Sequence, residues 1–200
     1  MLVLAADSLM SEDNIAAMSA AQELFAGANQ RGRVPGEGAA ALLLASPAWA
    51  MVPGTEPPLA QLYRANLMRR DKSADALGRV SPQVLLQTAT DALKSCGIEA
   101  ALVDRLTTDA DHRGSRTGEV YETMQELLPH LDATDHTLRL GVGCGDLGIA
   151  RLLACVGLAT TQVHESQKPA LILGAFPAFE RFAVLVAPTS APADANAAAP

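Results

Sequence analysis

Aromatic and basic residues are both scarce in this sequence of 200 residues. Phe, Trp and Tyr make up 4% of the chain, which leaves few rings on which nucleobases could stack. The 15 Lys and Arg residues stand against 22 Asp and Glu residues, for a net charge of −7, whereas proteins that hold a phosphate backbone present a basic face. The composition therefore argues against a nucleic-acid partner.

Cysteine is equally rare. Cys96, Cys144 and Cys155 are an odd number at no metal-ligand spacing, and such a set without a disulfide framework is typical of a reducing compartment. We therefore expect a cytoplasmic protein. The four histidines also lack the spacing of a zinc site, so we expect neither a metal nor a cofactor.

The sequence has no apolar run long enough to cross a membrane. The N-terminal MLVLAADSL is apolar but short, and it lacks a basic leader, so it predicts neither a signal peptide nor a span. Its segment Leu2–Ala6 instead predicts a buried strand of the parallel type. A core strand at the first residues indicates a chain that begins partway through a fold.

The stretch from Thr137 to Thr161 organises the rest of the sequence. It predicts a strand over Thr137–Val142, a glycine-rich turn, and a helix over Leu147–Ala159 that Asp146 caps. Arg151 is the one charged residue on this helix, and a helix that is apolar all round is normally buried on all sides. We therefore expect the central helix of a layered α/β domain here.

Other segments complete two unequal halves. The first half (1–47) predicts strand, helix and strand over 1–6, 11–26 and 39–45, and a proline-rich linker follows at 48–58. The second half (59–188) predicts strands at 59–68, 103–108, 137–142, 170–174 and 182–187, the last two as a hairpin, and helices at 82–96, 117–131 and 147–159. This alternation favours a mixed sheet with helices on both faces. Residues 189–200 predict a disordered tail.

Two motifs resemble the β-ketoacyl synthases of the thiolase-like superfamily. They are RVPGEGAAALLL at Arg33–Leu44 and GDLGIA at Gly145–Ala150. The resemblance implies an α/β fold with a mixed five-stranded sheet and helices on both faces, in which the second half is complete and the first half is partial.

The resemblance also implies a cysteine nucleophile and two histidines. The cysteine would lie on a helix before Leu2–Ala6, so this chain would lack it. The two histidine positions correspond to Asp111 and Asp146. Decarboxylative condensation needs a thiolate and N–H donors for a developing enolate, and an aspartate puts negative charge where negative charge must build up. The resemblance therefore implies a degenerate relative of the ketosynthases.

Four residues are candidates for a residual site. His112, beside Asp111, is either a shifted general base or a surface-loop histidine. Cys144 is either a thiol activated by a helix start or a small residue that fills a crowded turn. Asp146 is most simply a helix N-cap.

Three functions remain open. The first is a non-catalytic thiolase-fold protein that acts as a structural or assembly partner, which the resemblance links to bacterial type VI secretion. The second is an acyltransferase of the ketosynthase type, completed by another chain or by a missing N-terminal region. The third is an unrelated α/β binding module. We expect association with a second copy or a second thiolase-like chain, because Leu2–Ala6 would expose an apolar strand edge.

Overall fold

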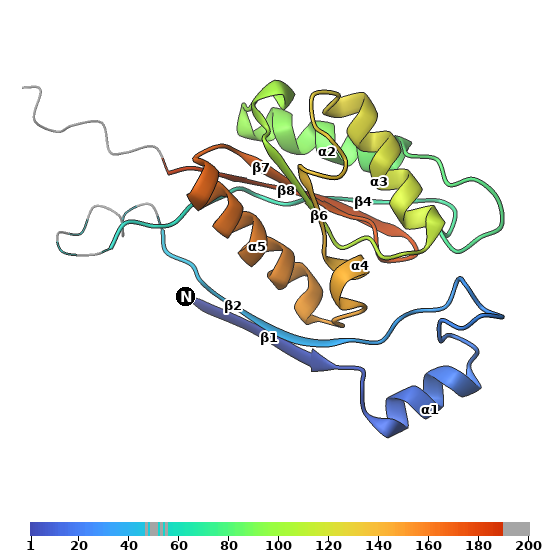
Figure 1. The fold of residues 1–200 in the computed structure, drawn as a ribbon. Helices are drawn as coiled ribbons and strands as arrows, with labels where there is room; N and C mark the ends of the chain where they lie inside the picture. Colours follow the sequence, from blue (N-terminus) through green and yellow to red (C-terminus); the bar gives the residue numbers. More distant parts are fainter. Residues whose placement is uncertain (47, 49–51, 53, 55, 190–200) are drawn as a thin grey trace, which may run out of the picture.

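The computed structural model describes residues 1–46, 48, 52, 54 and 56–189. Residues 49–51, 53 and 55 of the predicted linker and residues 190–200 of the predicted tail lie outside these residues. The described elements stack in four layers (Figure 1). Helices α2 (Gln83–Cys96) and α3 (Gly114–Leu127) cover one face of a large sheet, and helix α5 (Ala150–Ser166) covers the other. A small sheet lies beyond α5.

The large sheet contains six strands in five positions. The strands are β3 (Gln61–Leu62), β4 (Asn66–Arg69), β5 (Arg105–Thr108), β6 (Thr137–Arg139), β7 (Ala170–Gly174) and β8 (Glu180–Ala187). Their order is β3-β8-β7-β5-β6, and β4 also pairs with β8. Because β3 and β4 occupy one edge, they are the predicted strand 59–68 broken in two. Strand β8 runs antiparallel to its neighbours, and the pairs β5–β6 and β5–β7 are parallel. The predicted mixed sheet and terminal hairpin are therefore confirmed.

Burial explains why this sheet forms. Strand β7 and all but the first residue of β8 are buried, as continuous apolar runs covered on both faces should be. The core lies on both sides of the sheet. One cluster gathers Leu85, Leu106 and Leu128 under α2 and α3, and the other gathers Cys155 and Ile172 under α5.

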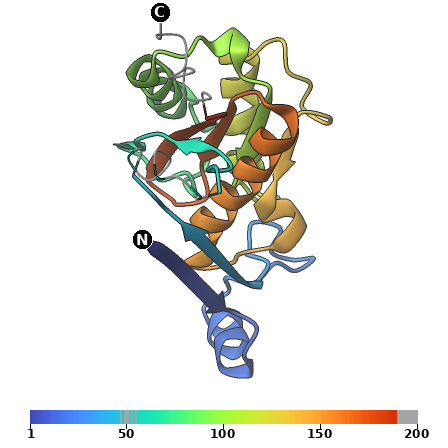
Figure 2. The ribbon, with the colours of Figure 1, turned by 90° about the vertical axis from the view of Figure 1, so that its left-hand side faces the viewer.

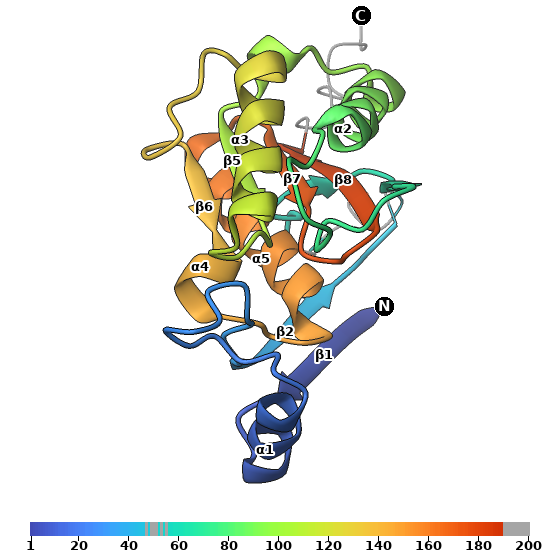
Figure 3. The same cartoon turned by 90° about the vertical axis from the view of Figure 1, so that its right-hand side faces the viewer.

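Local signals explain several helix ends. Helix α1 (Glu12–Ala20) is capped by Ser11, whose side chain accepts a hydrogen bond from the Asn14 backbone N–H. Helix α2 ends at Gly97, which has a left-handed φ of 66°. A short 3₁₀ helix, η2 (Ala100–Leu102), precedes β5. Helix α1 lies beyond one end of the small sheet (Figures 2 and 3).

The small sheet corrects one prediction. Strands β1 (Leu2–Ser8) and β2 (Glu37–Leu43) are antiparallel, with Leu2 opposite Leu43 and Ser8 opposite Glu37. Their residues alternate between exposed and half-buried, so the expectation of a buried strand of the parallel type over Leu2–Ala6 is wrong. The reason is that α5 covers one face, while the other face exposes apolar side chains.

The central helix also differs from its prediction. Helix α5 begins at Ala150 rather than Leu147, and its fully buried residues lie on the stripe that includes Cys155, Ala159 and Val163. Leu152 remains 43% exposed, so the helix is not buried on all sides. It is apolar nearly all round because it packs between two sheets, against β7 on one side and β2 on the other.

The predicted strand over Thr137–Val142 is too long. Strand β6 ends at Arg139, and a short helix α4 (Leu140–Cys144) follows. A Cβ atom at Gly141 would lie 2.5 Å from the Asp109 carbonyl oxygen, so this glycine permits a close backbone approach. In the described part of the chain, no helix is long and apolar enough to cross a membrane.

Candidate functional site

Three segments meet at one end of the large sheet. Strand β5 runs into Asp109 and the loop that starts α3, the β7–β8 turn passes beside it at Ala175 and Phe176, and the α4–α5 connection approaches with Asp146. Acidic and basic side chains from all three are buried here. This is the region in which the candidate residues of the sequence were expected.

Asp109 is fully buried at the centre of this region. One carboxylate oxygen accepts hydrogen bonds from the backbone N–H groups of Ala175 at 2.7 Å and Phe176 at 3.0 Å. The other oxygen lies 3.3 Å from Nε of Arg151. Burial raises the pKa of Asp109 above its ordinary value, although these hydrogen bonds and the positive charge act to lower it. The carboxylate ties β5 to the β7–β8 turn.

Asp146 is buried between two arginines. One oxygen accepts hydrogen bonds from the Gly148 backbone N–H at 3.0 Å and from Arg151 at 2.8 Å. The other accepts from Nε of Arg33 at 3.0 Å, and a second Arg33 nitrogen also contacts it. The N-cap position of α5 is Ile149, and no side chain caps it. Asp146 is therefore a charge-paired turn residue rather than the predicted N-cap.

The backbone around Asp146 joins the two halves of the chain. The Gly36 N–H donates to the Asp146 carbonyl at 3.0 Å, and the Asp146 N–H donates to the Val34 carbonyl at 2.8 Å. A Cβ atom at Gly36 would lie 2.3 Å from the Cys144 carbonyl oxygen. The glycines of the motif at Arg33–Leu44 thus allow this loop to dock against the α4–α5 connection.

Arg151 connects the two buried aspartates. It reaches Asp109 through Nε and Asp146 through a terminal nitrogen. Its guanidinium carbon lies 3.9 Å from the centre of the Phe176 ring, and that of Arg113 lies 4.9 Å from the same centre. A cation over an aromatic face is attracted to the ring electrons. The ring of Phe176 thus contacts both Arg113 and Arg151.

Asp111 and His112 take different positions. Asp111 is buried, and its carboxylate accepts from Nε of Arg113 at 2.7 Å and from the Arg113 backbone N–H at 3.1 Å. His112 is half-buried, and its ring meets Phe25 edge-on at 4.7 Å between centroids. Its Nε2 atom is buried without a hydrogen-bond partner. The two neighbours therefore do not form a hydrogen-bonded acid–base pair.

The thiols lie apart from these carboxylates or are inert. Cys144 is exposed at the end of α4. Cys155 is buried in α5, where burial and then the negative charge of Asp109 raise its pKa, so it stays a thiol. Among the described residues no group of three or more His, Cys, Asp and Glu side chains could hold a metal ion.

The pairing of carboxylates with arginines limits the chemistry that the site can carry out. Asp111 and Asp146 are both paired with arginines, and a carboxylate has no N–H group to donate to a developing oxyanion. Sequence reasoning missed Asp109, Arg33, Arg113 and Phe176. The one available signal was the cluster of acidic residues directly after a buried strand, because strand ends commonly carry functional side chains.

Comparisons with known proteins identify the fold. No protein-family model matches the sequence, and no curated protein matches it. Among solved structures, the ketosynthase from module 6 of the bacillaene synthase of Bacillus subtilis 168 has a TM-score of 0.71 at 13% identity. The PfaC keto synthase–chain length factor has a TM-score of 0.68 at 16% identity, and human mitochondrial 3-ketoacyl-CoA thiolase one of 0.53 at 15%.

These structures are much longer than the similar region. The alignment with the bacillaene ketosynthase covers 94% of this chain and 42% of that structure. The alignment with PfaC covers 94% of this chain and 20% of that structure, and the alignment with the human thiolase covers 76% and 36%. At these identities the similarity establishes the fold. The chain has a thiolase-like fold of the type found in β-ketoacyl synthases, which confirms the resemblance read from its motifs.

Proposed function

We propose that this chain is a non-catalytic thiolase-fold protein that acts as a structural or assembly partner. The observation that carries the proposal is the arginine pairing of Asp111 and Asp146, the residues at the positions that resemble catalytic histidines. Guanidinium groups can stabilise an oxyanion, but those of Arg33, Arg113 and Arg151 already hold carboxylates. Binding an enolate here would require breaking a buried ion pair, which is costly.

The exposed face of the small sheet supports the assembly role. Leu2 and Leu4 are each 68% exposed, and Leu43 is 80% exposed on the neighbouring strand. Within the described residues β1 pairs with β2 alone, so its other edge offers free backbone groups. Apolar faces and open edges of this kind favour association.

The partner in this proposal is a second copy of the chain or a second thiolase-like chain. One of the similar structures is described as a keto synthase–chain length factor, and this supports a pairing of two related chains. The link to bacterial type VI secretion and a cytoplasmic location remain predictions from the sequence.

The catalytic part of the proposal is tested by acylation. The purified chain is incubated with a labelled acyl thioester and then with a malonyl thioester, and the mass of the intact protein is followed. We expect no stoichiometric adduct that turns over. An adduct on Cys144 that is consumed by the malonyl thioester would instead favour the ketosynthase-type acyltransferase.

The assembly part is tested by light scattering. We expect a mass above the 20.8 kDa of one chain at micromolar concentration, or capture by a thiolase-like partner. Leu4→Lys should weaken this association, whereas Leu102→Lys should not, since Leu102 is also exposed but lies outside the small sheet. A monomer that melts sharply and binds no such chain would overturn the assembly role.

A further inference from the structure

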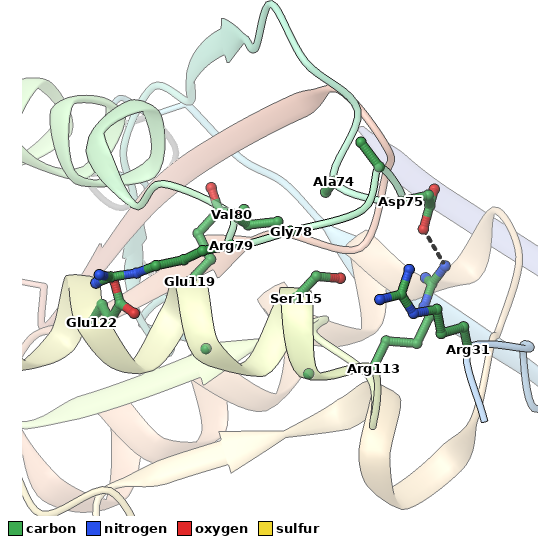
Figure 4. A pocket seen from close by; sticks show the side chains of 13 residues that line it. Arg31, Ala74, Asp75, Gly78, Arg79, Val80, Arg113, Ser115, Glu119 and Glu122 are labelled. Carbon is green, nitrogen blue, oxygen red and sulfur yellow. Dashed lines mark hydrogen bonds and ion pairs between the residues drawn. The ribbon is translucent and has the colours of Figure 1, made fainter.

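A pocket of about 330 Å³ lies beside the start of α3. Its walls come from the loop that carries Arg31, from segment 74–80 and from the first turns of α3 (Figure 4). Small-molecule sites span about 300–1,000 Å³, so this volume suits a small ligand. The candidate residues of the sequence do not line it, although Arg113 both lines it and holds Asp111.

Arginines outnumber carboxylates in the buried cluster behind this pocket. The cluster consists of Arg70, Arg113, Arg116 and Arg181, all buried, with Asp75, Asp111 and Glu119. Four guanidinium groups thus share three carboxylates, in a protein whose net charge is −7. Positive charge that is buried without a matching negative charge is unfavourable, so the cluster favours an added anion.

The individual pairs show how the carboxylates are shared. Glu119 accepts from Arg181 at 2.8 and 2.9 Å, and Arg70 lies 2.7 Å away. Asp75 pairs with Arg116 at 2.8 Å and with Arg113 at 3.3 Å. Burial lowers the pKa of Arg116, and the charges of its neighbours Arg113 and Arg181 lower it further, against the effect of Asp75. Both oxygens of Asp111 and of Glu119 thus contact arginines, whereas Asp75, whose side chain is 50% exposed, contacts Arg113 and Arg116 through Oδ1 alone. The cluster as a whole keeps one positive charge in excess.

A further cation lines the pocket itself. Arg31 lines the pocket together with Arg113 and Asp75, and all three are drawn at the same end of it in Figure 4. Within the described residues, no carboxylate pairs with Arg31. At the other end, Arg79 and Glu122 neutralise each other at 2.9 Å. The surplus of positive charge is therefore at the end that contains Arg31 and Arg113.

Glycines of α3 keep the pocket open. Gly114 and Gly118 line it, and a Cβ atom added at either position would meet no atom within 4 Å. Glycine inside a helix costs about 1 kcal/mol relative to alanine. Gly118 lies inside α3, so the helix bears this cost in stability at a position where a side chain would extend into the pocket.

We propose that this pocket binds a small phosphate-bearing molecule, with its phosphate group against Arg31, while Arg113 keeps its contacts with Asp75 and Asp111. Arginine holds phosphate oxygens through paired N–H donors. A water molecule occupies about 30 Å³ in the liquid, so a volume of about 330 Å³ leaves room for an organic group beside the phosphate. Ser115, which points toward this space in Figure 4, adds a hydroxyl group.

The test follows the backbone amide NMR signals of the full chain during titration with glycerol phosphate and, separately, with inorganic phosphate. We expect saturable shifts at Gly114, Ser115 and Gly118 that sodium chloride at equal ionic strength does not reproduce. Tighter binding of glycerol phosphate identifies an organic phosphate as the ligand, and equal binding identifies free phosphate. No saturable shift with either probe at millimolar concentration overturns the proposal.

Two variants and one control locate the site. Arg31→Gln removes an exposed cation and should weaken binding about tenfold, as expected for loss of one charge-assisted contact. Gly118→Leu should abolish binding by filling the pocket, without penalty to the helix. Arg139→Gln removes an exposed arginine without a carboxylate partner in the described chain, and should leave the affinity unchanged. Unchanged binding in both pocket variants would overturn the assignment.

Discussion

Replacing Arg151 tests most directly how much the buried charge network contributes to the stability of the fold. The change Arg151→Met keeps an unbranched side chain against Phe176 but removes the cation that Asp109 and Asp146 share. Asp146 keeps Arg33, whereas Asp109 keeps two backbone N–H donors and loses its positive partner. Removing one member of a buried pair costs about 3–5 kcal/mol. We expect about 3 kcal/mol, because the Arg151 side chain is 15% exposed.

The assay is urea unfolding followed by circular dichroism, with a shared slope for all variants. A loss of about 3 kcal/mol is a large part of a total stability of about 5–15 kcal/mol. The double variant Asp109→Asn with Arg151→Met should recover about 2 kcal/mol, because asparagine still accepts the two backbone hydrogen bonds without a charge. Arg139→Met, an exposed control, should change stability by less than about 0.5 kcal/mol.

The pH dependence gives an independent check. The pKa of Asp109 is raised in the folded state above the unfolded value of 3.8, so the folded protein binds its proton more tightly. The free energy of unfolding therefore decreases as the pH rises from the pKa of Asp109 in the unfolded chain to its higher pKa in the folded protein, because the carboxyl group ionises over this range. Without Arg151 that pKa rises further, and the loss should be larger near pH 7 than near pH 4. An equal loss at both pH values, or no recovery in the double variant, would refute the reasoning.

Two further substitutions test other parts of the structure. Glu119→Gln leaves Arg181 and Arg70 without their carboxylate and should lower the free energy of unfolding in urea by about 3–5 kcal/mol. A decrease no larger than that caused by Glu126→Gln, a change at an exposed residue, would contradict this. Gly36→Ala places a Cβ atom 2.3 Å from the Cys144 carbonyl oxygen and should speed hydrogen exchange at the Asp146 amide, where unchanged exchange would show that the loop adapts.

Periodicity and turn residues predicted the second half of the fold. Continuous apolar runs marked β7 and β8, and Gly97 marked the end of α2, because each of these signals is local. The lengths of α5 and β6 were wrong for a different reason. The apolar composition of a helix indicates that other elements cover it, but it does not identify those elements. Helix α5 is covered by two sheets and keeps one edge exposed.

The candidate site was less predictable because its contacts are distant in sequence. Asp146 was predicted as an N-cap from its neighbours, yet its partner Arg33 lies 113 positions away. Arg70 is likewise buried against Glu119, which lies far from it in the sequence. Charged residues give no local periodicity, so their burial is decided by partners that only the folded chain brings together.

The pairing of charges limits what the buried carboxylates can do chemically. Groups that carry out acid–base or nucleophilic steps need a perturbed pKa and an unpaired atom that faces the substrate. Asp109, Asp111 and Asp146 instead direct their oxygens at arginines and backbone amides. The network therefore joins the loop at Arg33 to the end of β5 and to the α4–α5 connection, and the contribution of these contacts is measurable as stability in the unfolding assay.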